Sequence, residues 1–177
     1  MKEKISTSPH RAIFWDRDGT LMAEVEYCGD PALVRAIPGV AEALADLRSA
    51  GWLHVIITNQ SGIGRGFFTV EEYQAVNAAL FRQLDFTFDG VYFCPELPEG
   101  ASHRRKPGTG MIEEACADLG IDPVRSWFVG DRCSDISCGR TAGCRTILVR
   151  TGYGAGVGDC GADCVLDSAA AVPLALR

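Results

Sequence analysis

An apolar run at residues 12–15 ends directly in two aspartates, Asp16 and Asp18, and Gly19 follows them. The run predicts a buried strand, and the glycine permits the sharp turn that can bring both carboxylates round one ligand. Two carboxylates crowded at a strand end repel each other unless they share a positively charged partner. The chain must therefore fold so that a strand delivers acids to a site suited to a hard cation and a phosphoryl group.

Apolar runs alternate with segments of helical period along the rest of the chain, which is typical of a parallel sheet covered by helices. The sequence predicts strands at residues 12–15, 53–58, 91–93, 127–130, 146–149 and 165–166. It predicts helices at residues 40–50, 69–84, 110–119 and 135–142, and a short final helix. We therefore expect an α/β fold with a Rossmann-like parallel sheet flanked by helices. The 177 residues fit a single domain, 1–177.

Polar side chains follow three of the predicted strands. Asp16 follows the first strand, Thr58 ends the second and Asp131 follows the fourth. Open parallel sheets bind their ligands beyond the carboxyl ends of the strands. We expect these three side chains to converge on one site.

The composition disfavours several classes of protein. A hydrophobic fraction of 47% with 23% charged residues is ordinary for a soluble globular chain, and no stretch reaches the roughly 18 apolar residues that a membrane helix requires. The first residues lack the apolar run of a secretory signal, so a cytoplasmic location is expected. The net charge of −6 disfavours a nucleic-acid partner, because nucleic-acid phosphates bind basic surfaces. We expect a monomer that binds neither nucleic acid nor a membrane.

The chain contains eight cysteines, and a reducing cytosol opposes stable disulfides. No Cys-x-x-Cys pair occurs among them. The sequence therefore predicts reduced thiols without a metal-binding role.

The order Asp16-x-Asp18-Gly-Thr after a hydrophobic strand resembles the first motif of the haloacid dehalogenase (HAD) superfamily, whose members are mostly magnesium-dependent phosphatases. Further motifs of that superfamily are matched, in the same order, by Thr58, Lys106, and the pair Asp131 and Asp135. The resemblance implies an enzyme that hydrolyses phosphoric monoesters through an aspartyl-phosphate intermediate.

The resemblance also implies a role for each matching residue. Asp16 is the expected nucleophile, and Asp18 is the expected general acid for the leaving group and then the base that activates water. The Thr58 hydroxyl would hydrogen-bond the phosphoryl oxygens. Lys106 would hold the phosphoryl group and offset its repulsion from Asp16.

A magnesium ion is the implied cofactor, and it prefers oxygen ligands and keeps part of its water. The implied ligands are the carboxylates of Asp16 and Asp131 and the backbone carbonyl of Asp18. Asp135 is expected behind them, where it would orient a metal-bound water or Lys106. The alternative is that Asp135 is only a favourable acid at a helix N-terminus.

Residues 58–68 and 105–111 resemble one branch of the superfamily in particular. This branch contains the heptose-bisphosphate and histidinol-phosphate phosphatases and has no large cap domain. Loops at residues 22–37, 60–68 and 94–105 are then expected to set specificity. The candidate substrate-binding residues are Asn59, Arg65 and Arg105. A guanidinium group matches the geometry of a phosphate, so the two arginines favour a remote second phosphate, as in removal of the 7-phosphate from a heptose 1,7-bisphosphate.

One stretch departs from that branch, which commonly carries a zinc loop with the pattern Cys-x-His followed by Cys-x-Cys. The corresponding residues here are Cys94, Glu96, Ser102 and Arg104. Tetrahedral zinc needs a nearly complete set of nitrogen and sulfur ligands, and His103 has the wrong offset to restore the pattern. We therefore expect no structural zinc.

Three alternatives remain open from the sequence. Histidinol phosphate is a second candidate substrate in the same branch. A polynucleotide 3′-phosphatase shares the Arg-Lys-Pro stretch, but it would need a basic, aromatic-lined groove for the strand. A phosphosugar-binding regulator without catalysis is disfavoured because every acid needed for turnover is present.

Overall fold

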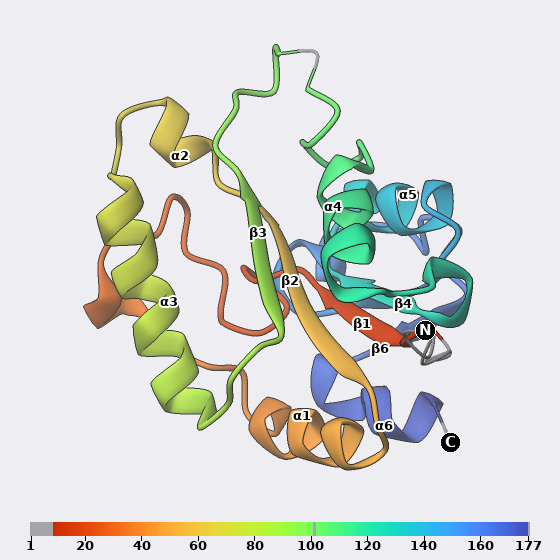
Figure 1. Ribbon diagram of the computed structural model, residues 1–177. Helices are drawn as coiled ribbons and strands as arrows, with labels where there is room; N and C mark the ends of the chain where they lie inside the picture. Colours follow the sequence, from red (N-terminus) through yellow and green to blue (C-terminus); the bar gives the residue numbers. More distant parts are fainter. Residues whose placement is uncertain (1–8, 101, 177) are drawn as a thin grey trace, which may run out of the picture.

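Six parallel strands form one sheet with the order β3-β2-β1-β4-β5-β6 in the computed structural model, which describes residues 9–100 and 102–176 (Figure 1). The strands are β1 (Ala12–Trp15), β2 (Leu53–Asn59), β3 (Gly90–Cys94), β4 (Trp127–Gly130), β5 (Arg145–Val149) and β6 (Cys164–Leu166). This order places β1 between β2 and β4, so the segments that follow these three strands meet at one edge of the sheet. The predicted α/β fold with a helix-flanked parallel sheet is confirmed.

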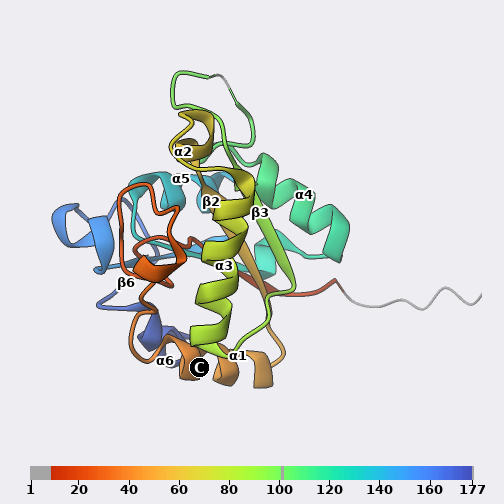
Figure 2. The ribbon, with the colours of Figure 1, turned by 90° about the vertical axis from the view of Figure 1, so that its left-hand side faces the viewer.

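Helices cover both faces of the sheet. The α-helices are α1 (Val40–Ser49), α2 (Ser61–Gly64), α3 (Val70–Leu84), α4 (Gly110–Leu119), α5 (Cys133–Thr141) and α6 (Val172–Ala175). Short 3₁₀ helices are η1 (Pro31–Leu33), η2 (Pro123–Arg125), η3 (Gly152–Gly156) and η4 (Ala169–Ala171). In both views α2 and the segment between β3 and α4 project beyond the same end of the sheet (Figures 1 and 2).

The burial of β1 shows why a continuous apolar run was needed. Ile13 and Trp15 join the hydrophobic core under α1 and α3, whereas Phe14 joins the second core under α4 and α5. All three side chains are fully buried. Because successive side chains of a strand point to opposite faces, a strand in the middle of such a sheet must be apolar on both sides.

Two local differences from the predicted elements have identifiable causes. Residues Ser61–Gly64 form one helical turn, α2, within the stretch that was predicted as a loop. Helix α5 begins at Cys133 rather than at Asp135, because the Asp135 carboxylate accepts a hydrogen bond of 3.0 Å from the backbone N–H of Arg132 and caps the first turn. The predicted helix at residues 69–84 corresponds to α3, which begins with a capping box in which Thr69 and Glu72 are bonded reciprocally.

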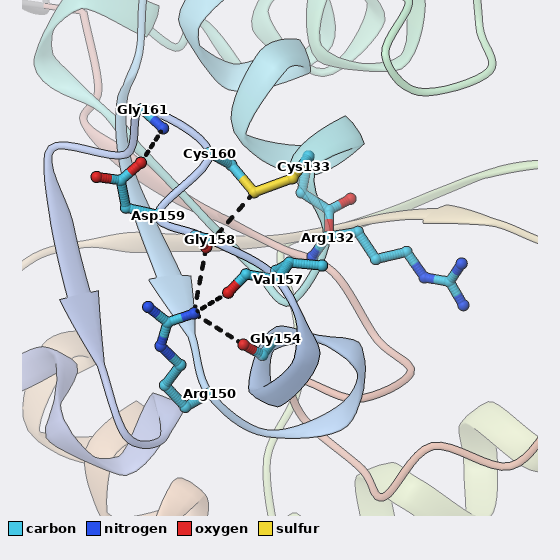
Figure 3. Close-up of a disulfide and its surroundings, with 10 residues drawn as sticks. Arg132, Cys133, Arg150, Gly154, Val157, Gly158, Asp159, Cys160 and Gly161 are labelled. Carbon is cyan, nitrogen blue, oxygen red and sulfur yellow. Dashed lines mark hydrogen bonds between the residues drawn. A yellow bond between two sulfur atoms is a disulfide. The ribbon is translucent and has the colours of Figure 1, made fainter.

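The prediction of reduced thiols is wrong for one pair of cysteines. Cys133 and Cys160 form a disulfide with their Cα atoms 5.1 Å apart, and six other cysteines are free (Figure 3). Their separation of 27 residues gives no sign of pairing in the sequence. The fold brings them together because the segment after β5 returns to the start of α5, which follows the neighbouring strand β4.

Within residues 9–100 and 102–176, none of the helices combines the length and the apolar character that crossing a lipid bilayer demands.

The disulfide predicts how many thiols react with an alkylating reagent before and after reduction. Alkylation of the unfolded protein without reductant should add six groups, and alkylation after reduction should add eight, as measured by intact mass. Replacing Cys133 and Cys160 together by serine should lower the free energy of unfolding by about 2–4 kcal/mol, because the bond restricts the unfolded chain. Eight adducts without reductant would contradict the assignment.

Candidate active site

Asp16 lies directly after β1, in the middle of the sheet. Its backbone N–H donates to the carbonyl of Val129 at 2.9 Å, so pairing with β4 extends through this residue. The side chain is only 6% exposed, and its Oδ1 lies 2.6 Å from Nζ of Lys106. The first motif acid is therefore held on the rigid strand end against a buried cation.

Lys106 reaches the same point from the segment between β3 and α4. Its ammonium group lies 2.6 Å from Asp16 Oδ1, 2.7 Å from Asp135 Oδ1 and 2.9 Å from the carbonyl oxygen of Ile57. The contacts with Asp16 and Ile57 are hydrogen bonds, and the contact with Asp135 is an ion pair. One positive charge thus lies between two carboxylates.

Asn59 fixes the backbone of Lys106. Its side-chain Nδ2 donates to the Lys106 carbonyl at 3.1 Å, and its Oδ1 accepts from the Lys106 N–H at 3.0 Å. Asn59 lines the cleft as predicted, but both ends of its amide are occupied by this contact. Its position at the end of β2 therefore couples Lys106 to the central sheet.

Asp18 is held by two neighbours that the motif analysis did not single out. Arg17 donates from Nε to Oδ2 at 3.1 Å and from Nη2 to Oδ1 at 3.0 Å. Gln60 donates from Nε2 to Asp18 Oδ2 at 2.8 Å and also lies 3.0 Å from the Thr58 hydroxyl. Through Gln60, the second motif is connected to the second acid of the first motif.

Arg17 is a fully buried cation, although it occupies the variable position of its motif. Its Nη1 donates to Asn77 Oδ1 at 2.9 Å, and its guanidinium carbon lies 5.2 Å from the centroid of the Tyr73 ring. Both partners are on α3. The burial of an arginine beside Asp18 could not be predicted because its partners lie about 60 residues further along the chain.

Asp131 and Asp135 follow β4 and complete the acidic cluster. Asp131 Oδ2 accepts a hydrogen bond of 2.7 Å from the backbone N–H of Tyr153. Its other oxygen, Oδ1, is buried and has no hydrogen-bond partner among the described residues. Carboxylate oxygens of Asp16, Asp131 and Asp135 all lie within 4.8 Å of one another.

Two glycines leave the space that the Asp131 carboxylate occupies. Gly19 (φ +80°) and Gly152 (φ +55°) both face it so closely that a methyl group on either residue would overlap Asp131 Oδ2. The Thr151 hydroxyl ties these segments together by donating to the Gly19 carbonyl. The segment that follows β5 thus lies against the acidic cluster.

The burial of the cluster shifts the pKa values of its members. Burial raises the pKa of Asp16 well above its ordinary value, and the other acids reinforce this, while Lys106 opposes it. Burial and the charge of Asp135 raise the pKa of Asp131 to about 6. Burial alone would lower the pKa of Lys106, but Asp135 and Asp16 outweigh it, so the pKa is raised and the lysine stays charged.

The donor set fits a hard divalent cation. If all three carboxylates were ionised, one lysine would leave two negative charges without a partner, and a divalent cation would balance them. Oδ1 of Asp131 has no hydrogen-bond partner among the described residues and is an unused ligand atom. Magnesium binds carboxylate and carbonyl oxygens, which are the groups that the Asp16 and Asp131 side chains and the backbone of Asp18 supply. The sequence-derived choice of ligands is thus chemically consistent with the cluster.

A cleft of about 670 Å³ opens above the cluster. Its lining includes Asp16, Asp18, Asn59, Arg65, Arg105, Lys106 and Asp135. Thr58 and Asp131 lie below this surface, and both are buried. Arg65 is exposed at the end of α2, and Arg105 donates from Nη1 to the carbonyl of Glu96 at 2.9 Å.

The residues at the zinc-loop positions form hydrogen bonds and ion pairs with the protein. The Cys94 thiol lies 3.9 Å from the Ser102 hydroxyl, which also accepts the backbone N–H of Arg104 at 3.2 Å. The Arg104 side chain pairs with Glu114 at 2.7 Å, and His103 contacts Glu113 at 2.9 Å on the surface. A thiol, a hydroxyl and a guanidinium do not make a tetrahedral zinc set, so these residues do not fit that metal.

Comparison with known proteins points to one family. The family described as HAD-hyrolase-like matches residues 103–166. The chain is 41% identical over 170 residues to D-glycero-beta-D-manno-heptose-1,7-bisphosphate 7-phosphatase of Haemophilus ducreyi, which covers 89% of this chain and 93% of that protein. It is also 41% identical over 160 residues to D-glycero-D-manno-heptose-1,7-bisphosphate 7-phosphatase of Thermosynechococcus vestitus, covering 82% of each chain.

Solved structures agree with the sequence comparison. The crystal structure of D,D-heptose 1.7-bisphosphate phosphatase from B. bronchiseptica, complexed with magnesium and phosphate, superposes with a TM-score of 0.87 and 32% identity. The match covers 94% of this chain and 97% of that chain. The likeness therefore extends over nearly the whole fold.

The close approach of Gly152 to Asp131 makes a substitution test possible. Gly152→Ala should weaken Mg²⁺ binding by about 10- to 100-fold, because the added methyl group displaces the carboxylate of Asp131, which is expected to be a ligand. Gly156→Ala, in the same turn but with nothing within 4 Å of the new methyl group, is the matched control. Isothermal titration calorimetry measures both, and wild-type affinity in Gly152→Ala would contradict this account of Asp131.

Proposed function

The chain belongs to the HAD-like family of heptose-bisphosphate phosphatases, and from this membership and its acidic cluster we propose that it removes the 7-phosphate of a heptose 1,7-bisphosphate with Asp16 as nucleophile. That the chain is a phosphoric monoester hydrolase follows from the family. The observation that carries the proposed role of Asp16 is the buried contact of Lys106 with both Asp16 and Asp135 at the floor of the cleft. The proposed substrate is supported by the names of the relatives.

In the first step, Asp16 attacks the phosphorus atom and the bond between phosphorus and the sugar oxygen breaks. Oδ1 of Asp16 accepts a hydrogen bond from Lys106, whereas Oδ2 takes none among the described residues and remains for the attack. Lys106 reduces the repulsion between this carboxylate and the incoming phosphate. The product of the step is an aspartyl-phosphate and a sugar alkoxide, which needs a proton.

Asp18 is the proposed proton donor. It lies at the edge of the cleft with 18% of its side chain exposed, and Arg17 and Gln60 fix its direction. After the sugar leaves, the ionised Asp18 takes a proton from a water molecule that attacks the phosphorus atom. Phosphate is then released and the Asp16 carboxylate is restored.

We propose that Asp16, Asp131 and the Asp18 carbonyl hold a magnesium ion. When bound, the ion neutralises charge on the phosphoryl oxygens. Asp135 does not need to be a ligand, because its two oxygens already contact Lys106 and the N–H of Arg132. Its proposed role is to keep Lys106 in place. Thr58 remains the proposed hydrogen-bond donor to the phosphoryl group.

The second phosphate is assigned to the cleft wall formed by α2 and the segment before Lys106. Arg65 and Arg105 line this wall and come from the two segments that project beyond the sheet (Figure 2). Two guanidinium groups on one side of the cleft favour a substrate with a second anionic group. Support also comes from the relatives, whose names specify a 1,7-bisphosphate.

Asp16→Asn should reduce kcat with heptose 1,7-bisphosphate by about 10⁴-fold or more, because an amide cannot attack phosphorus to form the aspartyl-phosphate. Thermal unfolding and circular dichroism should remain close to wild type. Asp46→Asn, an exposed carboxylate on α1, is the control and should keep full activity. Turnover retained by Asp16→Asn would remove this residue from its proposed role.

Arg65→Ala and Arg105→Ala should each lower kcat/KM for the bisphosphate by about 10- to 100-fold, mainly through KM, because each loses a charged hydrogen bond. Hydrolysis of p-nitrophenyl phosphate, which has no second phosphate, should change little. Arg82→Ala on the exposed surface of α3 serves as control. An unchanged KM for the bisphosphate in both cleft variants would show that the second phosphate binds elsewhere.

A further inference from the structure

A buried amide on α3 is linked to the proposed proton donor, although it does not line the cleft. The side chain of Asn77 is 6% exposed and accepts a hydrogen bond of 2.9 Å from Nη1 of Arg17. Arg17 in turn donates hydrogen bonds to both carboxylate oxygens of Asp18. One arginine therefore connects a helix on the face of the sheet to a group of the proposed reaction.

Arg17 and Asp18 are neighbours in the chain, so their contact alone fixes neither side chain to the rest of the fold. A guanidinium and a carboxylate on the same turn can move together as one body. The remaining nitrogen of Arg17 supplies the fixed point, because Nη1 binds Asn77. The guanidinium carbon also lies 5.2 Å from the centroid of the Tyr73 ring, one turn earlier on α3. The anchor of Asp18 is therefore on this helix.

Helix α3 is a firm support for this anchor. Val76 and Leu80, close to Asn77 in the helix, are fully buried in the core that also contains Trp15. Trp15 is the last residue of β1, and Asp18 lies in the turn that follows this strand. Figure 2 shows α3 lying along this face of the sheet. The helix and the end of β1 thus belong to one packed unit, which a positioning contact requires.

The hydrogen bonds of Asp18 leave one acceptor position free. Each carboxylate oxygen can accept two hydrogen bonds. Oδ2 accepts from Arg17 Nε at 3.1 Å and from Gln60 Nε2 at 2.8 Å, so both of its positions are occupied. Oδ1 accepts from Arg17 Nη2 at 3.0 Å and from no other group among the described residues. Oδ1 can therefore carry the proton for the leaving group without breaking any hydrogen bond of this network.

We propose that Asn77 is a positioning residue for the departure of the sugar: it fixes Arg17, and Arg17 holds Asp18 with Oδ1 as the atom that passes on the proton. This inference rests on the proposed role of Asp18, but it does not depend on which sugar phosphate is the substrate. No hydrogen bond joins Asn77 to Asp16 within the described parts of the chain, so its loss should spare the nucleophile.

The test uses Asn77→Leu, which removes the accepting oxygen and keeps most of the side-chain volume. Release of the leaving group is measured in a single turnover, because this isolates the first step from hydrolysis of the aspartyl-phosphate. With heptose 1,7-bisphosphate, whose alkoxide needs a proton, the rate should fall by about 10- to 100-fold. With p-nitrophenyl phosphate, whose leaving group is a stable anion, it should stay within about 3-fold of wild type.

Two further variants separate positioning from a loss of stability. Asn77→Asp keeps an oxygen acceptor for Arg17 and should restore the rate with the bisphosphate to within about 5-fold of wild type. Ser126→Ala is the control, because it also removes a fully buried hydrogen-bonding group, but directly before β4 and away from the cleft. It should lower the melting temperature and leave the ratio of the two rates unchanged. If leucine prevents folding, Asn77→Ala carries the same prediction.

Asp18→Asn shows whether the inference or the proposed function has failed. It should give the same selective loss, to a greater extent. If it does, but Asn77→Leu affects both substrates equally or neither, the positioning role is wrong and the proposed function stands. If Asp18→Asn shows no selective loss, the proposed role of Asp18 fails and the role of Asn77 fails with it.

The choice of sugar is tested separately. If wild type rejects heptose 1,7-bisphosphate but hydrolyses glucose 6-phosphate, the proposed substrate is wrong. The rates with glucose 6-phosphate and p-nitrophenyl phosphate are then compared, since its leaving group is also an alkoxide. A selective loss in Asn77→Leu with that ester supports the positioning role, and equal rates for both esters relative to wild type overturn it.

Discussion

A single buried ammonium group, that of Lys106, lies between the carboxylates of Asp16 and Asp135. The strands around the site hold these three residues in place. Carboxylates this deeply buried are costly unless they are paired. The central place of β1 delivers Asp16, β4 delivers the other acids, and Asn59 at the end of β2 holds the backbone of Lys106. One lysine cannot balance three acids, which is why the cluster is suited to a divalent cation.

The sequence predicted the elements around this contact well where the local signal was strong. The strands at 12–15 and 127–130 and the helix at 110–119 agree with the structure to the residue, because uninterrupted apolar or amphipathic runs end there at polar residues or glycine. The motif acids and Lys106 were also found from sequence, since their spacing and order are distinctive. Long-range pairing left no such signal: Arg17 depends on Asn77 of α3, and Cys133 depends on Cys160.

Two arginines that line the cleft each lie over an aromatic ring. Arg65 stands over the ring of Tyr27 on one side, and Arg132 stands over the ring of Tyr153 on the other. Both guanidinium groups contact aromatic rings and donate no hydrogen bond within residues 9–100 and 102–176. Arg65 was indicated from the sequence through its motif, whereas the contact of Arg132 could not be predicted, because Tyr153 lies beyond β5.

The central claim is that the acids at the end of β1 and β4 are held together by a divalent cation and Lys106 around one phosphoryl site. A crystal structure with Mg²⁺ and orthovanadate tests it most directly. The account predicts vanadium bonded to an oxygen of Asp16, the metal ion in contact with Asp16 and Asp131, and Lys106 still between Asp16 and Asp135. Vanadate bound away from Asp16, or a metal ion that does not touch Asp131, would contradict it.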